Sequence, residues 1–442
     1  MWNDAYIFIG KFPTLFFFQH NRNSSEKNFA SQRPVPVQSA YRPDHSTETA
    51  LLRVMNDLLM AVDGGNAAIL ALLDQSAAFD TIDHSVLLDR LSTRFGIRGS
   101  ALDWFSSYLA NRSQSVQVFG VTSPPIFLTC GVPQGSVLGP VMFTLYNSPI
   151  HDIAVHHGIS DQYYADDAQQ HKTFKPTVDG MEQRIAYAAL SNCIGETRQW
   201  MSANRMKFNE SKTDALLVHG NHTPNEHPLM VGDVPIIPSK NVRNLGVIFD
   251  SRLTMEPQIN SMCRRAYYHL HRISRIRKFL SDSAAAQLVH AFVTSTLDYG
   301  NSLLVGLPSK RLDKLQAVQN MAARLIARRR KYDHISDVLI NLHWLPVSSR
   351  ITFKIATQTY RCINNCAPVY LSELISRRKF RSSLDLILPK TKLVNYGDRS
   401  FAKMAPKIWN SIPLPIRSAN SLSQFRSMLK TYLFKLEYPN AK

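Results

Sequence analysis

The chain has 442 residues and a formal net charge of +18, with 44% apolar and 10% aromatic residues. This composition excludes a disordered or fibrous protein, and a chain of this size buries more than one hydrophobic core. Five cysteines are too few for a disulfide scaffold and are typical of a reducing, intracellular compartment. The positive charge predicts a polyanionic partner, but the total alone does not distinguish nucleic acid from a membrane surface.

The positive charge is concentrated in the second part of the chain. Residues 1–251 carry 19 basic and 23 acidic side chains, whereas residues 252–442 carry 32 basic and 10 acidic ones. A slightly acidic first part and a strongly basic second part indicate two modules with different electrostatic roles.

The first 36 residues differ from the rest of the chain. Residues 5–18 are mostly apolar, but Lys11 and Pro13 interrupt the run, and it is too short to cross a bilayer. No basic segment precedes it, as a signal peptide requires. We therefore predict that residues 1–36 are a leader, unrelated to the folded domains or poorly ordered, and we expect no membrane partner.

The next segments alternate between helix and strand patterns. Apolar spacing predicts a helix over 47–62, and the continuous apolar run 67–73 predicts a strand that is buried on both faces and ends at Asp74. Further helices are expected over 84–95, 100–109 and about 137–146, with short strands over 115–119 and 126–129.

A hairpin is predicted around residues 162–170, with Asp166 and Asp167 in its turn. A long amphipathic helix over 180–203 and strands over 215–219 and 242–249 follow. From residue 254 onward the pattern is almost entirely helical, so the sequence indicates an α+β core followed by a basic helical region.

Three features of the α+β core combine into a candidate catalytic site. Asp74 ends a buried strand, Asp166 and Asp167 lie in a hairpin turn, and the loop 131–136 (GVPQGS) opens a helix between them. Clustered carboxylates repel one another, so a site that keeps them ionised normally holds divalent cations. Two such ions about 4 Å apart activate a hydroxyl and stabilise a leaving oxygen in phosphoryl transfer. Taken singly, each feature is more often a cap, an ordinary turn or an ordinary loop.

The segments 72–80 (LLDQSAAFD), 131–140 (GVPQGSVLGP) and 164–167 (YADD) resemble motifs A, B and C of a reverse transcriptase, in particular of non-LTR, LINE-type retrotransposons of the jockey-like group. The resemblance continues downstream and covers the chain from about Gln38 to Leu433. Residues 200–217 resemble motif D, residues 244–250 resemble motif E, and 297–301 and 397–415 resemble the helical region that follows in this group.

The resemblance implies a set of metal ligands. Asp74 and Asp166 would be the main Mg²⁺ ligands, the backbone carbonyl of Gln75 a third ligand, and Asp167 a nearby carboxylate with a lesser role. Two Mg²⁺ ions are expected, with Mn²⁺ as an alternative.

The resemblance also implies a nucleotide site. The ring of Phe79 would lie under the sugar and exclude a 2′-hydroxyl, and Gln134 would hydrogen-bond near the nucleotide and template. Gly131 and Gly135 would allow close backbone approach, and Lys212 would protonate the leaving pyrophosphate. From spacing alone, Phe79 is more often a core aromatic residue and Lys212 a solvated lysine.

Other polar residues near motif A have simpler interpretations. Asp83 is expected to cap the helix that begins near His84, and Asp80 is expected to lie in the turn from strand to helix. Neither residue is expected to be a metal ligand. Cys362 and Cys366 are expected to be structural thiols, because no second Cys/His pair has a zinc-binding spacing.

The basic half contains a stretch, residues 261–280, with six basic and no acidic side chains. A patch of one sign predicts phosphate contacts, although solvated helix faces are the simpler alternative. Tyr267 and Tyr268 are candidates to stack on bases, whereas Trp344 and Trp409 are expected in the core. In the family these helices form the thumb that grips the template–primer duplex, and the residues expected to contact nucleic acid are Arg264, Arg265, Arg272, Arg275, Arg277 and Lys278.

The resemblance is incomplete at its beginning. The chain enters the family pattern near the end of the fingers region that grips the triphosphate, and no endonuclease segment resembles the one that this group carries upstream. We therefore expect an N-terminally truncated element. Motif A reads Asp-Gln-Ser where Asp-Leu-Ser is commoner, and motif C reads Asp-Asp-Ala, but neither change removes a carboxylate.

Together these observations predict a right-hand polymerase of the α+β class whose palm contains an antiparallel sheet. The expected parts are partial fingers (37–66), the palm (67–250), an all-α basic thumb (251–345) and a helical C-terminal extension (346–442).

The expected activity is RNA-directed DNA polymerisation, in which a DNA primer is extended on an RNA template with deoxynucleoside triphosphates. The alternative is a truncated transposon remnant that binds nucleic acid and polymerises little or not at all. An unrelated structural or interaction protein is disfavoured by the intact carboxylates. A nuclear location follows by analogy with elements that prime on chromosomal DNA.

Overall fold

The computed structural model describes most of the chain. The described residues are 36–76, 79–133, 135–221, 224–225, 227–377 and 384–440. The predicted leader therefore lies outside the described residues except for its last position, and so does the predicted nucleotide contact Gln134.

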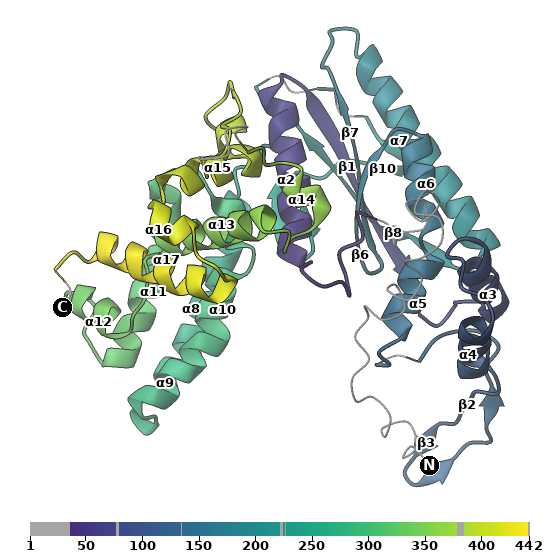
Figure 1. The fold of residues 1–442 in the computed structure, drawn as a ribbon, viewed down its shortest axis with the longest axis horizontal. Helices are drawn as coiled ribbons and strands as arrows, with labels where there is room; N and C mark the ends of the chain where they lie inside the picture. The colour runs from purple at the N-terminus through teal and green to yellow at the C-terminus, as the bar shows by residue number, and fades with distance from the viewer. Residues whose placement is uncertain are drawn as a thin grey trace.

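A four-stranded antiparallel sheet forms the centre of the first part of the chain (Figure 1), and this confirms the predicted sheet. The strands lie in the order β6-β7-β1-β8. Their bounds are β1 Ala67–Ser76, β6 Ser160–Tyr164, β7 Asp167–Phe174 and β8 Lys207–Val218. Because β1 lies between β7 and β8, its backbone is hydrogen-bonded along both edges.

The central strand β1 is buried on both faces, as its apolar run predicts. Successive side chains of a strand point to opposite faces, so Ala68 and Leu70 belong to one hydrophobic core and Ile69 and Ala71 to another. The helices that fill the second core include α5 Gly139–Tyr146, α6 Pro149–His156 and α7 Met181–Ala203. One strand thus joins the two cores of the molecule.

The remaining elements of the predicted palm are short. They are α3 His84–Thr93, α4 Ser100–Leu109, β2 Ser113–Gln114, β3 Gln117–Val118, β4 Val121–Thr122, β5 Ile126–Phe127, β9 Leu229–Val231, β10 Val234–Ile236, β11 Asn241–Asn244 and β12 Val247–Asp250. The single strand predicted over 242–249 is wrong. Leu245 and Gly246 have φ angles of 42° and 82°, so the chain turns there and β11 pairs with β12 as a hairpin.

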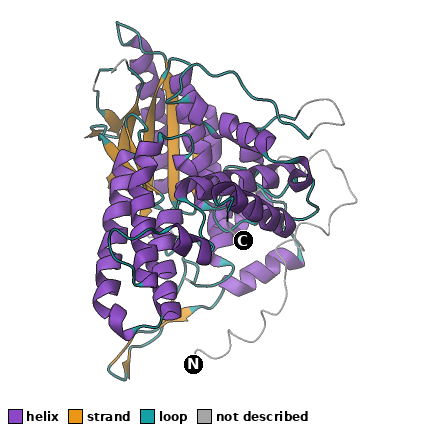
Figure 2. Cartoon of the chain, turned by 90° about the vertical axis from the view of Figure 1, so that its left-hand side faces the viewer, coloured by secondary structure: helices purple, strands orange, loops and turns teal. Residues whose placement is uncertain are grey.

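The first core continues into the helical second part of the chain. Helix α2 (Thr47–Asp63) lies between the sheet and the helices of the second part of the chain in Figure 1, and its apolar face shares this core. Trp344 and Trp409 are buried in the same core, which confirms their predicted role. Figure 2 shows helices in front of and behind the strands.

The helical part follows the predicted pattern. Its elements are α8 Glu256–Ile276, η2 Arg277–Phe279, α9 Asp282–Val289, η3 His290–Thr294, α10 Ser295–Asp298, η4 Asn301–Leu304, α11 Ser309–Ala327, α12 Ser336–Asn341, α13 Val347–Ile363, α14 Val369–Ser372, η5 Gly397–Arg399, α15 Phe401–Ser411, α16 Leu414–Arg417 and α17 Leu422–Glu437. Among the described residues, no helix is both long enough and apolar enough to span a membrane.

Asp83 caps helix α3, as predicted. Its Oδ1 accepts hydrogen bonds from the backbone N–H groups of Ser85 and Val86 at 2.9 and 3.0 Å, and its Oδ2 lies 2.7 Å from Arg205 Nη1. The Ser85 hydroxyl, the backbone amides and Arg205 hold the pKa of Asp83 below its usual value. The carboxylate is therefore committed to contacts within the fold.

We expect Asp83→Ala to lower the free energy of unfolding by about 1–2 kcal/mol, because the helix loses its cap. Urea denaturation followed by circular dichroism measures this difference. Asp89→Ala is the matched control: Asp89 is exposed on the same helix, and its loss should change stability by less than about 0.5 kcal/mol. Equal effects of the two substitutions would contradict the role of Asp83 as a cap.

Candidate active site

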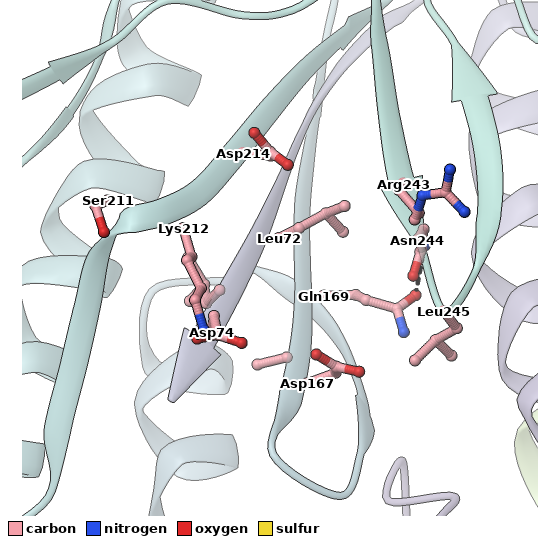
Figure 3. Close-up of a pocket in the computed structure, with 12 residues that line it drawn as sticks. Leu72, Asp74, Asp167, Gln169, Ser211, Lys212, Asp214, Arg243, Asn244 and Leu245 are labelled. Carbon is pink, nitrogen blue, oxygen red and sulfur yellow. Dashed lines mark hydrogen bonds and ion pairs between the residues drawn. The ribbon is translucent and has the colours of Figure 1, made fainter. Parts of the chain in front are cut away.

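A cavity of about 360 Å³ opens at the end of the sheet where β1 finishes and β7 begins. Figure 3 shows its lining, with Asp74 and Asp167 on neighbouring strands beside the opening and Lys212 reaching toward Asp74. The lining residues are Leu72, Leu73, Asp74, Asp167, Ala168, Gln169, Ser211, Lys212, Asp214, Arg243, Asn244 and Leu245. Apart from β1 and the start of β7, the wall comes from β8 and from the β11–β12 hairpin.

The register of the sheet brings two of the predicted carboxylates together. The last pair between β1 and β7 is Leu73 with Ala168, so Asp74 and Asp167 follow as cross-strand neighbours. Asp166 precedes Asp167 in the turn. The hairpin prediction is confirmed, but its turn is shorter than expected: β6 ends at Tyr164 and β7 begins at Asp167, so Asp167 belongs to the strand.

The other neighbour of β1 is distorted at this point. Leu72 pairs with Asp214 and Asp74 pairs with Asn209, so one residue of β1 faces four residues, 210–213, of β8. Such a bulge redirects side chains next to a site. Here Lys212 Nζ lies 3.4 Å from Asp74 Oδ2, and Asn209 Nδ2 donates to the same oxygen at 3.3 Å.

The two aspartates at the β6–β7 connection have raised pKa values. The pKa of Asp166 is raised by burial and by the charge of Asp74, while Lys212 partly offsets this. Partial desolvation by the surrounding protein, with the charges of Asp166 and Asp74, raises the pKa of Asp167 to about 6, although its side chain still reaches solvent. The site therefore gathers more negative charge than its surroundings neutralise, and a bound cation would relieve this repulsion.

The oxygen donors of the site fit a divalent cation whose coordination shell is completed by a substrate. The carboxylates are hard oxygen donors, but in the described part of the chain no three acidic, histidine or cysteine side chains form a ready-made metal cluster. Mg²⁺ is commonly bound by one or two carboxylates together with phosphate oxygens and water. Asp74, with Asp166 of the β6–β7 turn and Asp167 at the start of β7, provides this kind of partial shell.

The segment after Asp74 packs against motif B. Phe79 is half-buried, its ring centroid lies 5.1 Å from that of Phe143, and its carbonyl accepts from Val132 N–H at 2.9 Å. Gly131 has a φ of +86°, and a Cβ there would lie 2.9 Å from the carbonyl oxygen of Asp80. Motifs A and B therefore touch through their backbones, and Gly131 is required by that contact.

Gly135 and Gln75, which the resemblance places at the nucleotide and at a metal ion, are described by their contacts within the chain. A Cβ on Gly135 would meet open space among the described residues, so this glycine is needed for its φ of +81° and makes no close approach to its own chain. The side chain of Gln75 is buried, and its Oε1 accepts from Asn147 at 3.3 Å. The roles of the Gln75 carbonyl and of Gly135 at a nucleotide stay predictions.

Five of the six basic residues predicted to contact nucleic acid are exposed: Arg264, Arg265, Arg272, Arg275 and Lys278. The first four lie on α8, and Lys278 follows in η2. The exposed Tyr268 lies beside Arg272, whose Nη1 donates to its hydroxyl at 3.3 Å. These side chains form a continuous basic segment that faces solvent.

The prediction for Arg277 is wrong. Its side chain is only 7% exposed and donates to the carbonyls of Leu280, Leu325 and Ile326 at 2.6–2.8 Å. It also pairs with Asp282. The guanidinium joins the end of α8 to the end of α11 and is not presented to a phosphate.

We expect Arg277→Ala to lower the free energy of unfolding by about 2–3 kcal/mol, because it leaves buried carbonyls without donors. Arg275→Ala is the matched control, since this arginine is exposed two residues earlier and should change stability little. Chemical denaturation of both variants measures the difference. Comparable stabilities for the two variants would contradict the structural role of Arg277.

Comparison with known proteins identifies the family. The family model described as reverse transcriptase (RNA-dependent DNA polymerase) matches residues 26–249. The chain belongs to the reverse transcriptase family. The match begins within the segment that we assigned to a leader, so residues 26–36 are part of the matched region.

The similar curated proteins are RNA-directed DNA polymerases of Drosophila melanogaster transposons. The chain is 24% identical to that of transposon BS, 26% to that of the X-element and 25% to that of the mobile element jockey. These matches cover 65–68% of this chain and 31–33% of the relatives, so the chain spans about a third of their length. They confirm the predicted likeness to jockey-like retrotransposons.

Solved structures of telomerase also match. That of Candida albicans, in complex with a fragment of telomeric RNA, has a TM-score of 0.34 at 12% identity, covering 74% of this chain and 54% of the other. Apo telomerase of Candida tropicalis has a TM-score of 0.38 at 10% identity, covering 73% and 52%.

The polar residues that the sequence did not predict include Asp214 and Arg243 in the lining of the cavity and Asn209, which donates to Asp74 beside it. Asn209 and Asp214 lie in the motif D-like segment, and the bulge that separates them is not visible in the sequence pattern. Arg243 reaches the cavity because residues 241–250 form a hairpin instead of the predicted single strand.

Proposed function

We propose that this reverse transcriptase domain extends a DNA primer on an RNA template with deoxynucleoside triphosphates. The observation that carries the proposal is that Asp74 and Asp167 line one cavity and interact electrostatically with Asp166 beside it, although Asp74 and Asp166 are 92 positions apart in sequence. The polymerases named among the relatives support it, as does the exposed basic segment of α8.

Divalent cations, which the family generally uses, would be held by Asp74, Asp166 and Asp167. When bound, two Mg²⁺ ions would lower the pKa of the primer 3′-hydroxyl and stabilise the pyrophosphate oxygen that leaves. The aspartates would hold these ions and compensate their charge. Neighbouring protein groups, Asn209 and Lys212, hold Asp74 in place from β8.

Lys212 is suited to two tasks in this mechanism. Its side chain is 66% exposed and ends 3.4 Å from Asp74 Oδ2, so it partly neutralises the carboxylate in the free protein. Because the ammonium group remains accessible from the cavity, it would be available to donate a proton to the leaving pyrophosphate. Phe79, half-buried against Phe143, is the proposed steric filter against a ribose 2′-hydroxyl.

The exposed cations of α8 would bind the phosphates of the template–primer duplex. The binding of Lys and Arg to phosphates releases counterions, and this contributes affinity without base specificity. A nuclear location is part of the same proposal, because the primer would be chromosomal DNA.

We expect Asp166→Ala to abolish Mg²⁺-dependent extension of a DNA primer on RNA while binding of the primer–template persists, because the substitution removes one metal ligand and leaves α8 intact. Primer extension with radiolabelled product and fluorescence anisotropy measure the two properties. Asp233→Ala is the matched control, since Asp233 is an exposed aspartate in the β9–β10 hairpin turn.

Extension by Asp166→Ala at the wild-type rate would contradict the assignment of the site. Binding by the wild-type chain without any extension would favour the alternative of a protein that binds nucleic acid but does not polymerise.

We expect replacement of Arg264, Arg265 and Arg272 by Gln to reduce the slope of log affinity against log salt by about two to three units, because each phosphate contact contributes about 0.9. Anisotropy titrations between low and physiological salt measure this slope. The matched control replaces the exposed Arg426, Lys430 and Lys435 of α17 by Gln and should leave the slope unchanged. Equal changes in both variants would mean that only the total charge matters.

A further inference from the structure

The turn that carries Asp166 is held by a residue far away in the sequence. Ala165 precedes Asp166 and has a φ of 56°, a left-handed conformation that a residue with a Cβ adopts at a cost. The side-chain amide of Gln38 bonds both polar groups of Ala165. Ala165 N–H donates to Gln38 Oε1 at 3.1 Å, and Gln38 Nε2 donates to the Ala165 carbonyl at 3.3 Å.

Contacts other than those with the turn also hold Gln38 in place. Its side chain is only 5% exposed, and its Oε1 also accepts from Ala40 N–H at 3.0 Å. Its neighbours bond to the edge of the sheet: Tyr163 N–H donates to the Val37 carbonyl at 3.0 Å, and Ser39 N–H donates to the Tyr163 carbonyl at 2.9 Å. Hydrogen bonds in such a water-poor place are costly to lose, because the freed partners stay buried.

The C-terminal extension secures the same segment. The Tyr370 hydroxyl, from α14, lies 2.8 Å from Ser39 Oγ and donates to Thr49 Oγ1 at 3.0 Å. Ser39 Oγ also accepts from Gln162 Nε2 at 2.8 Å. The Tyr370 hydroxyl thus holds Ser39, and the side chain of Gln38, the adjacent residue in the chain, bonds the turn.

We propose that Gln38 is a positioning residue that fixes Asp166 against Asp74, and that Tyr370 of the C-terminal extension supports it. The inference rests on the proposed function for the role of Asp166 as a metal ligand. Without the two bonds from Gln38, Ala165 is free to leave its left-handed conformation, and Asp166 moves with it. The C-terminal extension therefore contributes to the geometry of the site from the opposite side of β6.

The test uses Gln38→Met in the full chain, a substitution that keeps the side-chain length and removes both bonds. Gln170→Met is the matched control, because Gln170 is a fully buried glutamine of the same sheet without a hydrogen bond to the turn. Both proteins are first checked for folding by circular dichroism. The binding of Mn²⁺ alone is then measured by electron paramagnetic resonance, without nucleic acid.

We expect Gln38→Met to weaken Mn²⁺ binding about tenfold, as the loss of outer hydrogen bonds does at other metal sites. In primer extension kcat should fall about tenfold or more while the KM for the nucleotide changes little. Hydrogen–deuterium exchange of the peptide containing Ala165 should become faster. Tyr370→Phe, which removes one hydroxyl, should shift all three measurements in the same direction by a smaller factor.

Wild-type Mn²⁺ affinity and wild-type exchange at Ala165 in a folded Gln38→Met protein would overturn the inference. If Gln38→Met does not fold, Tyr370→Phe decides by the same measurements, and unchanged exchange at Ala165 overturns the supporting role. A wild-type chain that does not extend a primer would contradict the proposed function alone, because hydrogen exchange at Ala165 reports on the Gln38 contact without any catalysis.

Discussion

The main physical constraint on the structure is the repulsion among three carboxylates, which the surrounding protein neutralises only in part. Asp74, Asp166 and Asp167 meet at one end of the sheet, where burial and their mutual charge raise the pKa of Asp166 and bring that of Asp167 to about 6. Within the described lining, Lys212 is the one cation that forms an ion pair with these carboxylates, through Asp74. Its side chain is 66% exposed, so water screens the interaction. An arrangement of this kind lowers stability unless a ligand compensates it, so the carboxylates indicate a cation and the phosphates that accompany it.

The rest of the fold maintains that arrangement. Strand β1 is anchored by apolar side chains in both cores, so its end cannot shift without disturbing the whole molecule. The bulge in β8 directs Asn209 and Lys212 onto Asp74, and Gly131 joins the segment after β1 to motif B. At the outer edge of β6, the side chain of Gln38 forms two hydrogen bonds with Ala165 in the β6–β7 turn. The helical half shares a core with α2, so the basic helix α8 belongs to the same body as the sheet.

Much of this was predictable where one local pattern determines the outcome. The apolar run before Asp74 predicted a strand buried on both faces, and Asp83 followed by a helical pattern predicted a cap. The strand over 242–249 was mispredicted, because the apolar residues continue through the Leu245–Gly246 turn and only the backbone angles reveal it. Arg277 was mispredicted, because its burial comes from carbonyls at the end of α11, which the local sequence does not show. Tertiary packing decided the burial of Arg277, whereas the hairpin at Leu245–Gly246 is a local turn.

The central claim, that Asp74 and the Asp166 turn bind the same cations, can be tested by iron-mediated cleavage. Fe²⁺ with ascorbate and peroxide is added to the full chain without nucleic acid, and backbone cleavage is mapped by mass spectrometry. The account predicts cleavage near both Asp74 and Asp166, suppressed by excess Mg²⁺ and absent after Asp166→Ala. Cleavage at one of the two segments alone, or cleavage that Mg²⁺ does not suppress, would contradict a shared metal site.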